Sequence, residues 1–302
     1  MAPLFKGSIV ALITPFTKSG RVDGKKIEQL VEWQIASGTD GIVCCGTTGE
    51  ALSLSESEMK RITEICVKTA AKRIPVIAGT GVSDTRFSVK NTERALKLGA
   101  DGCLISSPYY NKPTEKGCLR HIREISKVGL PMIYYYNPGR SGAKYSAEGV
   151  AEICQVPGVV LYKDSSHDID FIRSLKKLCP IPIASGCDDM NYDVMREGGV
   201  GAISVIGNII PGLWKKMIQS SLEGKWGIAE RLAQRCLSLC KGLFMEPSPQ
   251  GIKYAMSWTG RCQFEMRLPL IAPTLFTQRE LKKALLTLAL HQFETRLKTK
   301  IS

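Results

Sequence analysis

The chain has 302 residues, of which 41 are Lys or Arg and 28 are Asp or Glu, so its formal net charge is +13. A hydrophobic content of 44% and a charged content of 23% are ordinary for a globular protein and exclude a disordered or fibrous chain. No apolar run approaches the ~20 residues that a membrane helix needs, and the short apolar stretch 8–15 ends in a proline without a cleavage motif, so we expect neither a membrane segment nor a signal peptide.

Eight short runs rich in Val, Ile and Leu are predicted to be β-strands. Each is almost continuously hydrophobic, which is typical of parallel strands covered on both faces. The runs span residues 9–13, 41–45, 76–79, 102–106, 132–136, 159–163, 181–185 and 201–205.

An amphipathic stretch follows each of these runs and is predicted to be a helix. Ser55 and Glu58 have the spacing of a capping box, Ser146 is suited to cap another helix, and Gly38 and Gly99 stand where helices should end. The expected helices span residues 22–37, 55–72, 84–98, 114–127, 145–155, 167–178, 188–198 and 211–222.

Eight strand–helix repeats predict an α/β fold in which a parallel sheet closes into a (β/α)8 TIM barrel. The alternative is an open doubly wound sheet, but its dinucleotide fingerprint is missing, because Gly79-Thr80-Gly81 lacks the third glycine. We expect the barrel over residues 1–223 and a C-terminal α-helical region over residues 224–302. Within that region the pattern indicates helices near 225–244, 248–258 and 278–297.

The cysteines and histidines bear on metal binding and on compartment. There are eleven cysteines, an odd number without a C-x-x-C pair, and the three histidines at 121, 167 and 291 do not form a metal-binding motif. We therefore expect no metal site, and buried free thiols in a reducing compartment, the cytoplasm.

Polar residues that follow the predicted strands indicate chemistry at the carboxyl ends of the barrel. Lys163 ends an apolar run, and burial there favours the neutral amine that attacks a carbonyl to form a Schiff base, although a lysine extending to solvent is the alternative. Tyr135 on the adjacent strand can transfer protons, Arg140 suits a carboxylate, and Thr47 and Thr48 offer hydroxyls. Together these groups favour carbonyl chemistry on an anionic keto acid.

The motifs that carry these residues also point to a family. The chain contains Gly-Thr-Thr-Gly-Glu at 46–50, Tyr-x-x-Pro-x-Arg at 135–140, Lys163, and Ser185-Gly186 followed by Gly-Ala-Ile-Ser-Val at 201–205. In this order it resembles the dihydrodipicolinate synthase and N-acetylneuraminate lyase family of pyruvate-dependent class I aldolases, from about Phe5 to Pro211 and more loosely beyond.

The resemblance implies a reaction and its participants. The activity would be that of a lyase, 4-hydroxy-tetrahydrodipicolinate synthase, which condenses pyruvate with L-aspartate 4-semialdehyde on the route to diaminopimelate and lysine. No separate cofactor would be needed, because pyruvate itself forms a covalent Schiff base with the enzyme.

The resemblance also implies residue roles. Lys163 would form the Schiff base, and Tyr135 would protonate and deprotonate the intermediates. Thr47 and Tyr110, the latter from a neighbouring subunit, would complete the proton relay, which implies a homo-oligomer, usually a tetramer in this family. Thr48 would hold the pyruvate carboxylate and Arg140 the semialdehyde carboxylate.

Two further positions would line the pocket, and two depart from the family pattern. Gly186 and the carbonyl of Ile203 are the expected lining groups. Tyr136 stands where Asn is common, which leaves open whether Tyr135 or Tyr136 faces the site, and Cys187 stands where Asp is common, so hydrogen bonding in its loop should differ.

Feedback regulation is predicted to be weak or absent. Some family members are inhibited by lysine at a subunit interface through paired His or Trp residues. The corresponding positions here are Glu56 and Met59, and Ser83 stands where Asn is frequent.

Three rival functions remain to be weighed. Another pyruvate-dependent 2-keto acid aldolase, such as an N-acetylneuraminate lyase, would carry a Gly-Ser-Thr-Gly-Glu variant and an apolar residue in place of Arg140. A non-catalytic member would have no need of its lysine, tyrosine and threonine. Nucleic-acid binding is not expected, because recognition motifs are missing and the basic residues, with a modest concentration at Lys282, Lys283, Arg296, Lys298 and Lys300, are interpreted as solvated surface.

Overall fold

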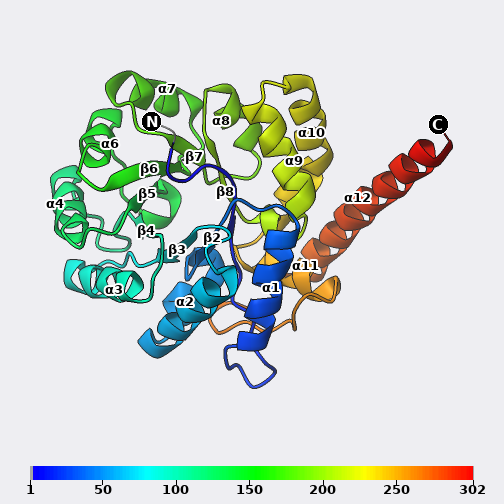
Figure 1. Ribbon diagram of the computed structural model, residues 1–302, viewed down its shortest axis with the longest axis horizontal. Helices are drawn as coiled ribbons and strands as arrows, with labels where there is room; N and C mark the ends of the chain where they lie inside the picture. Colours follow the sequence, from blue (N-terminus) through cyan, green and yellow to red (C-terminus); the bar gives the residue numbers. More distant parts are fainter. Residues whose placement is uncertain (1–2, 302) are drawn as a thin grey trace.

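A closed parallel barrel forms the centre of the protein (Figure 1). The computed structural model describes residues 3–301, with side chains described as far as residue 289. All eight predicted strands are present, each pairs in parallel with the next, and the last pairs with the first, so the predicted TIM barrel is confirmed. The strands are β1 (Gly7–Ala11), β2 (Gly41–Cys44), β3 (Val76–Gly79), β4 (Gly102–Ser106), β5 (Met132–Tyr136), β6 (Val159–Asp164), β7 (Ile183–Ser185) and β8 (Gly201–Ser204).

Two hydrophobic layers hold the barrel together, because successive side chains of a strand point to opposite faces. The inner layer fills the barrel with residues such as Ile9, Ile77 and Leu161. The outer layer packs the other face of each strand against the surrounding helices, as Ile42 and Met132 do.

Eight helices surround the barrel, one after each strand. The predicted caps are present: Ser55 and Glu58 form a reciprocal capping box, Ser146 accepts from the backbone N–H of Gly149, and Gly38 has the positive φ of a helix-ending glycine. The helices are α1 (Gly24–Ala36), α2 (Glu56–Ala70), α3 (Thr85–Lys97), α4 (Glu115–Ser126), α6 (Ala147–Cys154), α7 (Ile169–Leu178), α8 (Asn191–Arg196) and α9 (Pro211–Leu222).

Several boundaries differ from the predicted ones. The first strand is displaced toward the N-terminus, because Gly7 and Ser8 pair with β8 whereas Ile13 lies beyond the ladder. Short turns escape detection because they contain too few residues to show a hydrophobic period. They are η1 (Thr47–Gly49), η2 (Ala51–Ser53), α5 (Pro138–Ser141) and η3 (Ile206–Asn208).

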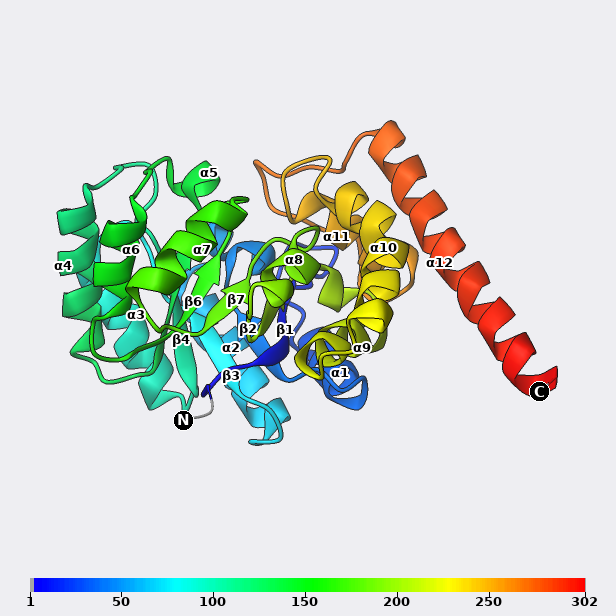
Figure 2. The same ribbon diagram turned by 90° about the horizontal axis from the view of Figure 1, so that it is seen from above.

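Three further helices follow the barrel: α10 (Trp226–Leu243), α11 (Gln250–Trp258) and α12 (Leu275–Ile301). Helix α10 packs on α9 and α12, and Figure 2 shows α12 projecting away from the barrel. Helix α12 begins earlier than predicted because Thr274 caps it, accepting from the backbone N–H of Thr277 at 3.4 Å. The division at residue 223 stays a prediction, and the basic side chains at 296, 298 and 300 lie outside the described side chains.

None of the described helices is both long and apolar enough to cross a bilayer.

Candidate active site

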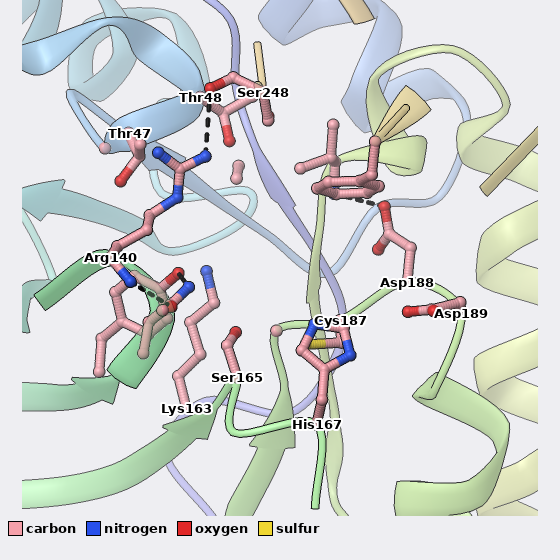
Figure 3. Close-up of a pocket in the computed structure, with 18 of the residues that line it drawn as sticks. Thr47, Thr48, Arg140, Lys163, Ser165, His167, Cys187, Asp188, Asp189 and Ser248 are labelled. Carbon is pink, nitrogen blue, oxygen red and sulfur yellow. Dashed lines mark hydrogen bonds between the residues drawn. The ribbon is translucent and has the colours of Figure 1, made fainter. Parts of the chain in front are cut away.

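A cavity of about 640 Å³ opens at the carboxyl ends of the strands, where a TIM barrel carries its chemistry. Strand ends and the loops after them supply its floor and one wall. The opposite wall comes from the end of α10 and the loop that follows, including Phe244 and Ser248. Figure 3 shows Thr47, Arg140 and Lys163 directed into this space.

Lys163 lies on the floor of the cavity. It is on β6, paired with Tyr135 on β5 and with Ala184 on β7, and the residue is only 6% exposed. Alternation along β6 turns Lys163 inward and leaves its neighbour Asp164 to accept from the Tyr162 hydroxyl at 2.8 Å. The side chain of Lys163 therefore enters the barrel mouth, as the sequence predicts.

Tyr135 and Tyr136 point to opposite sides of β5. The ring of Tyr135 belongs to the inner layer and lies 4.1 Å from Lys163 Nζ, measured to the ring centroid. Tyr136 packs outside the barrel against Tyr145 and Phe171, and its hydroxyl accepts from the backbone N–H of Tyr145 at 2.8 Å. Of the two tyrosines, only Tyr135 lines the cavity.

Asn137 connects the tyrosine to the arginine. Its Nδ2 donates to the Tyr135 hydroxyl at 2.9 Å, while its Oδ1 accepts from the backbone N–H of Arg140 at 3.0 Å and so caps α5. The exposed Arg140 side chain then donates from Nη2 to the carbonyl of Ser248 at 3.1 Å (Figure 3). One amide therefore fixes the phenol and the start of the arginine helix together.

Thr47 and Thr48 lie on the η1 turn after β2. Thr48 is buried and Thr47 is half-buried, and both line the cavity. Thr47, Tyr135 and Arg140 also border a second cavity of about 540 Å³, whose far side includes Leu52 and Tyr109. The two cavities therefore meet at the predicted relay residues.

Gly186 allows close packing beside the lysine. A Cβ atom built on it would lie 2.6 Å from Lys163 Cε and would collide with Ser165 Oγ. Ser165 is buried, lines the cavity, and has no hydrogen-bond partner for its hydroxyl among the described residues. The floor thus presents an unpartnered hydroxyl next to the amine.

The loop after Gly186 carries a buried carboxyl and a thiol. Burial raises the pKa of Asp188 to about 7, although hydrogen bonds from the backbone N–H groups of Ile206 and Val205 oppose this shift. Burial also raises the pKa of Cys187 to about 12, and its Sγ lies 3.1 Å from His167 Nε2. At Cys187 the loop therefore carries a thiol–imidazole contact, and the difference from the family pattern stays a prediction.

Two predicted residues lie outside the cavity. Tyr110 has a positive φ of 69° and a side chain that is 94% exposed, so within its own chain it makes no part of the site. Ile203 is buried in the inner layer and is not among the residues that line the cavity. The remaining predicted residues, Thr47, Thr48, Tyr135, Arg140, Lys163 and Gly186, all border it.

The sequence reasoning missed three features of the site. Asn137 before Pro138 is a recognisable helix start, since Asn is a favoured N-cap and Pro a favoured first helical residue. Asp188 has no local signal of its burial. The wall formed by residues 240–248 comes from a segment far along the chain, which no local pattern places over the barrel mouth.

Among the described residues, no group of three or more His, Cys, Asp or Glu side chains is arranged to hold a metal ion.

The chain is similar to known proteins along nearly its whole length. Residues 4–288 match the family model described as the dihydrodipicolinate synthetase family. The 4-hydroxy-tetrahydrodipicolinate synthase of Thermodesulfovibrio yellowstonii is 43% identical over 270 residues, which cover 88% of this chain and 92% of that protein.

Solved structures agree with this result. Dihydrodipicolinate synthase from Aquifex aeolicus superposes with a TM-score of 0.90 at 37% identity, covering 93% of this chain and 97% of that one. The chloride-inhibited dihydrodipicolinate synthase from Acinetobacter baumannii, crystallised with pyruvate, gives a TM-score of 0.90 at 36% identity, covering 94% and 99%. The resemblance predicted from the motifs is confirmed, and the similarity continues past Pro211 into the C-terminal helices.

Proposed function

This chain belongs to the dihydrodipicolinate synthetase family, and we propose that its barrel site acts as a 4-hydroxy-tetrahydrodipicolinate synthase, condensing pyruvate with L-aspartate 4-semialdehyde. The observation that carries the proposal is the buried Lys163 amine, 4.1 Å from the Tyr135 ring centroid, on the floor of a cavity that also holds hydroxyls and a guanidinium. These are the groups that Schiff-base chemistry on a keto acid requires.

Lys163 supplies the covalent step. After giving up a proton, its Nζ attacks C2 of pyruvate, the carbonyl oxygen leaves as water, and loss of a proton from C3 gives an enamine. The enamine carbon bonds to the aldehyde carbon of the semialdehyde, whose oxygen takes up a proton. Attack of the semialdehyde amine on C2 then closes the ring and releases Lys163, so no other cofactor is consumed.

Tyr135 moves the protons of these steps. Its phenol is held at 2.9 Å by Asn137 Nδ2, which directs one lone pair and leaves the O–H free to donate. Thr47 borders both cavities beside it and is suited to pass the proton onward. Tyr110 of the partner subunit completes the relay.

That role of Tyr110 requires at least a dimer, and we propose a tetramer because this is the usual state in the family. Tyr110 is 94% exposed and follows Tyr109, which lies on the wall of the second cavity, and this supports its entry into a neighbouring site. The exposed Leu52, at 74%, adds apolar surface on the same wall, and contiguous exposed apolar surface is typical of protein interfaces.

Two sites bind the substrate carboxylates. Thr48 and the backbone of η1 hold the carboxylate of pyruvate, and the exposed guanidinium of Arg140 binds that of the semialdehyde at the cavity mouth. Gly186 leaves room for the Schiff base beside Lys163 Cε.

We also propose the cytoplasm as the compartment and residues 224–302 as a helical region appended to the barrel. All eleven cysteines are free and buried, which supports a reducing environment.

The test is chemical trapping on Lys163. The chain is incubated with pyruvate, reduced with borohydride and digested, and mass spectrometry is expected to find the adduct on Lys163. A coupled assay is then expected to show turnover with L-aspartate 4-semialdehyde. Lys163→Ala should abolish both signals, and Lys176→Ala, which removes an exposed lysine of α7, serves as the matched control.

Each outcome discriminates between functions. No adduct would refute every aldolase function for this chain. An adduct without turnover of the semialdehyde would favour another pyruvate-dependent aldolase, such as a lyase of N-acetylneuraminate type.

A further inference from the structure

Glu50 is the last residue of the Gly-Thr-Thr-Gly-Glu motif. It is not among the residues that line either cavity. It has the left-handed backbone conformation, with φ 56°, and its N–H closes the η1 turn by donating to the carbonyl of Thr47 at 3.0 Å. Its side chain is turned away from the cavity, toward the C-terminal helices. A non-glycine residue in this conformation is held there by its surroundings.

The surroundings are an ion pair shut off from solvent. Glu50 Oε1 accepts from Lys253 Nζ on α11 at 2.6 Å, and both side chains have an exposed fraction of 0%. Glu50 Oε2 accepts from the backbone N–H of Arg267 at 3.1 Å, and the Lys253 ammonium lies 4.1 Å from the centroid of the Phe16 ring. A buried ammonium is tolerated only when it is paired in this way.

The η1 turn that carries Thr47 and Thr48 is held in place by the Glu50–Lys253 ion pair. Among the described residues, no hydrogen bond is formed by the hydroxyls of Thr47 and Thr48, so these groups are free for substrate and do not anchor the turn. Its other anchor is Thr14, whose hydroxyl donates to the carbonyl of Gly49 at 2.6 Å.

We propose that Glu50 and Lys253 are positioning residues, a buried ion pair through which α11 of the C-terminal region sets the Thr47–Thr48 turn for pyruvate. The inference rests on the proposed function, because it assumes that these hydroxyls bind pyruvate and relay protons. It gives the C-terminal helices a part in catalysis although they are not part of the barrel.

The test separates positioning from stability. Glu50→Gln keeps the shape of the side chain and removes its charge, and Glu50→Gln/Lys253→Met removes both charges. We expect the KM for pyruvate to rise roughly tenfold and borohydride-trapped adduct to form more slowly, because ~1 Å of displacement in a binding group has effects of this size or larger. The KM for the semialdehyde should stay within about twofold, because Arg140 is held separately through Ser248.

A second ion pair provides the control. Lys215 pairs with Asp40 at 2.6 Å just before β2, on the opposite end of the barrel from the cavity. Asp40→Asn should lower the melting temperature and leave both KM values unchanged. If Glu50→Gln alone does not fold, the double variant, which leaves no unpaired charge, supplies the same measurement.

Suppose that the wild-type chain forms the adduct. A folded Glu50→Gln variant or double variant whose KM for pyruvate stays within twofold of wild type would then overturn the inference alone. A wild-type chain that forms no adduct would overturn the proposed function, and the inference with it.

Discussion

Gly186→Ala is the sharpest test of how the site is packed. The added Cβ would lie 2.6 Å from Lys163 Cε and 2.8 Å from the carbonyl oxygen of Asp164, and it would collide with Ser165 Oγ. Ser165 can rotate away, but the Asp164 carbonyl is backbone and accepts from the N–H of Gly186 itself at 2.6 Å. The strain therefore has to be relieved by moving the lysine or the strand ends.

The expected effect is larger on activity than on stability. Overpacking of this kind costs about 1–3 kcal/mol, which for a chain of this size lowers the melting temperature by a few degrees. A shift of ~1 Å at the reacting amine costs on the order of 100-fold in rate. We therefore expect kcat/KM for pyruvate to fall by about 100-fold, with much slower trapping of the adduct on Lys163.

The matched control is Gly227→Ala on α10. Gly227 lies in a helix, and a Cβ built there has no atom within 4 Å, so alanine should stabilise the chain slightly and leave the kinetics unchanged. Steady-state kinetics and thermal unfolding of both variants make the comparison. Wild-type kcat/KM in Gly186→Ala would refute the idea that the space beside Lys163 is limiting.

Four further results are expected. Asn137→Asp keeps the cap of α5 but removes the donor to Tyr135, so kcat should fall about tenfold with little change in melting temperature; unchanged kcat would contradict a role for this bond. Tyr136→Phe should cost about 1–3 kcal/mol, because a buried N–H loses its acceptor, yet leave kcat intact, and urea denaturation with kinetics checks both. Burial raises the pKa of Asp188 from 3.8 to about 7, so the folded chain holds a proton that the unfolded chain releases, and the free energy of unfolding should fall as pH rises from 4 to 7 by up to about 4 kcal/mol; Asp188→Asn should lose that slope in urea titrations. Sub-millimolar lysine should leave the coupled assay uninhibited, since Glu56 is already paired with Arg94 at 2.6 Å, and inhibition in that range would contradict this expectation.

The sequence predicted the barrel well because parallel strands buried on both faces leave an unmistakable pattern. Continuous runs such as 132–136, short and rich in β-branched and aromatic residues, are typical of covered strands, and the ends of parallel strands meet at one edge of the sheet. The sequence alone therefore places Lys163, Tyr135 and Thr47 at one site. The sequence left open which of Tyr135 and Tyr136 faces the site, and in the structure Tyr135, which pairs with Lys163, lines the cavity.

What the sequence could not provide was contact between distant segments. Glu50 and Lys253 are 203 residues apart, and nothing near either residue indicates that the other neutralises it. The same holds for Ser248 and Arg140, which are 108 residues apart. Local periodicity places a residue on a face of its own element, whereas these pairs depend on how the C-terminal helices dock on the barrel.

The net positive charge of the chain is not concentrated in the cavity. Three cationic side chains, Arg140, Lys163 and Lys241, and three acidic ones, Asp188, Asp189 and Glu246, line the cavity, so the excess of +13 is located elsewhere on the chain. Burial raises the pKa of Asp188 to about 7, so this carboxyl is partly protonated near neutral pH. The positive charges of the lining side chains then outnumber the negative ones. Protonation of this one buried carboxyl therefore favours the binding of anionic keto acids at the site.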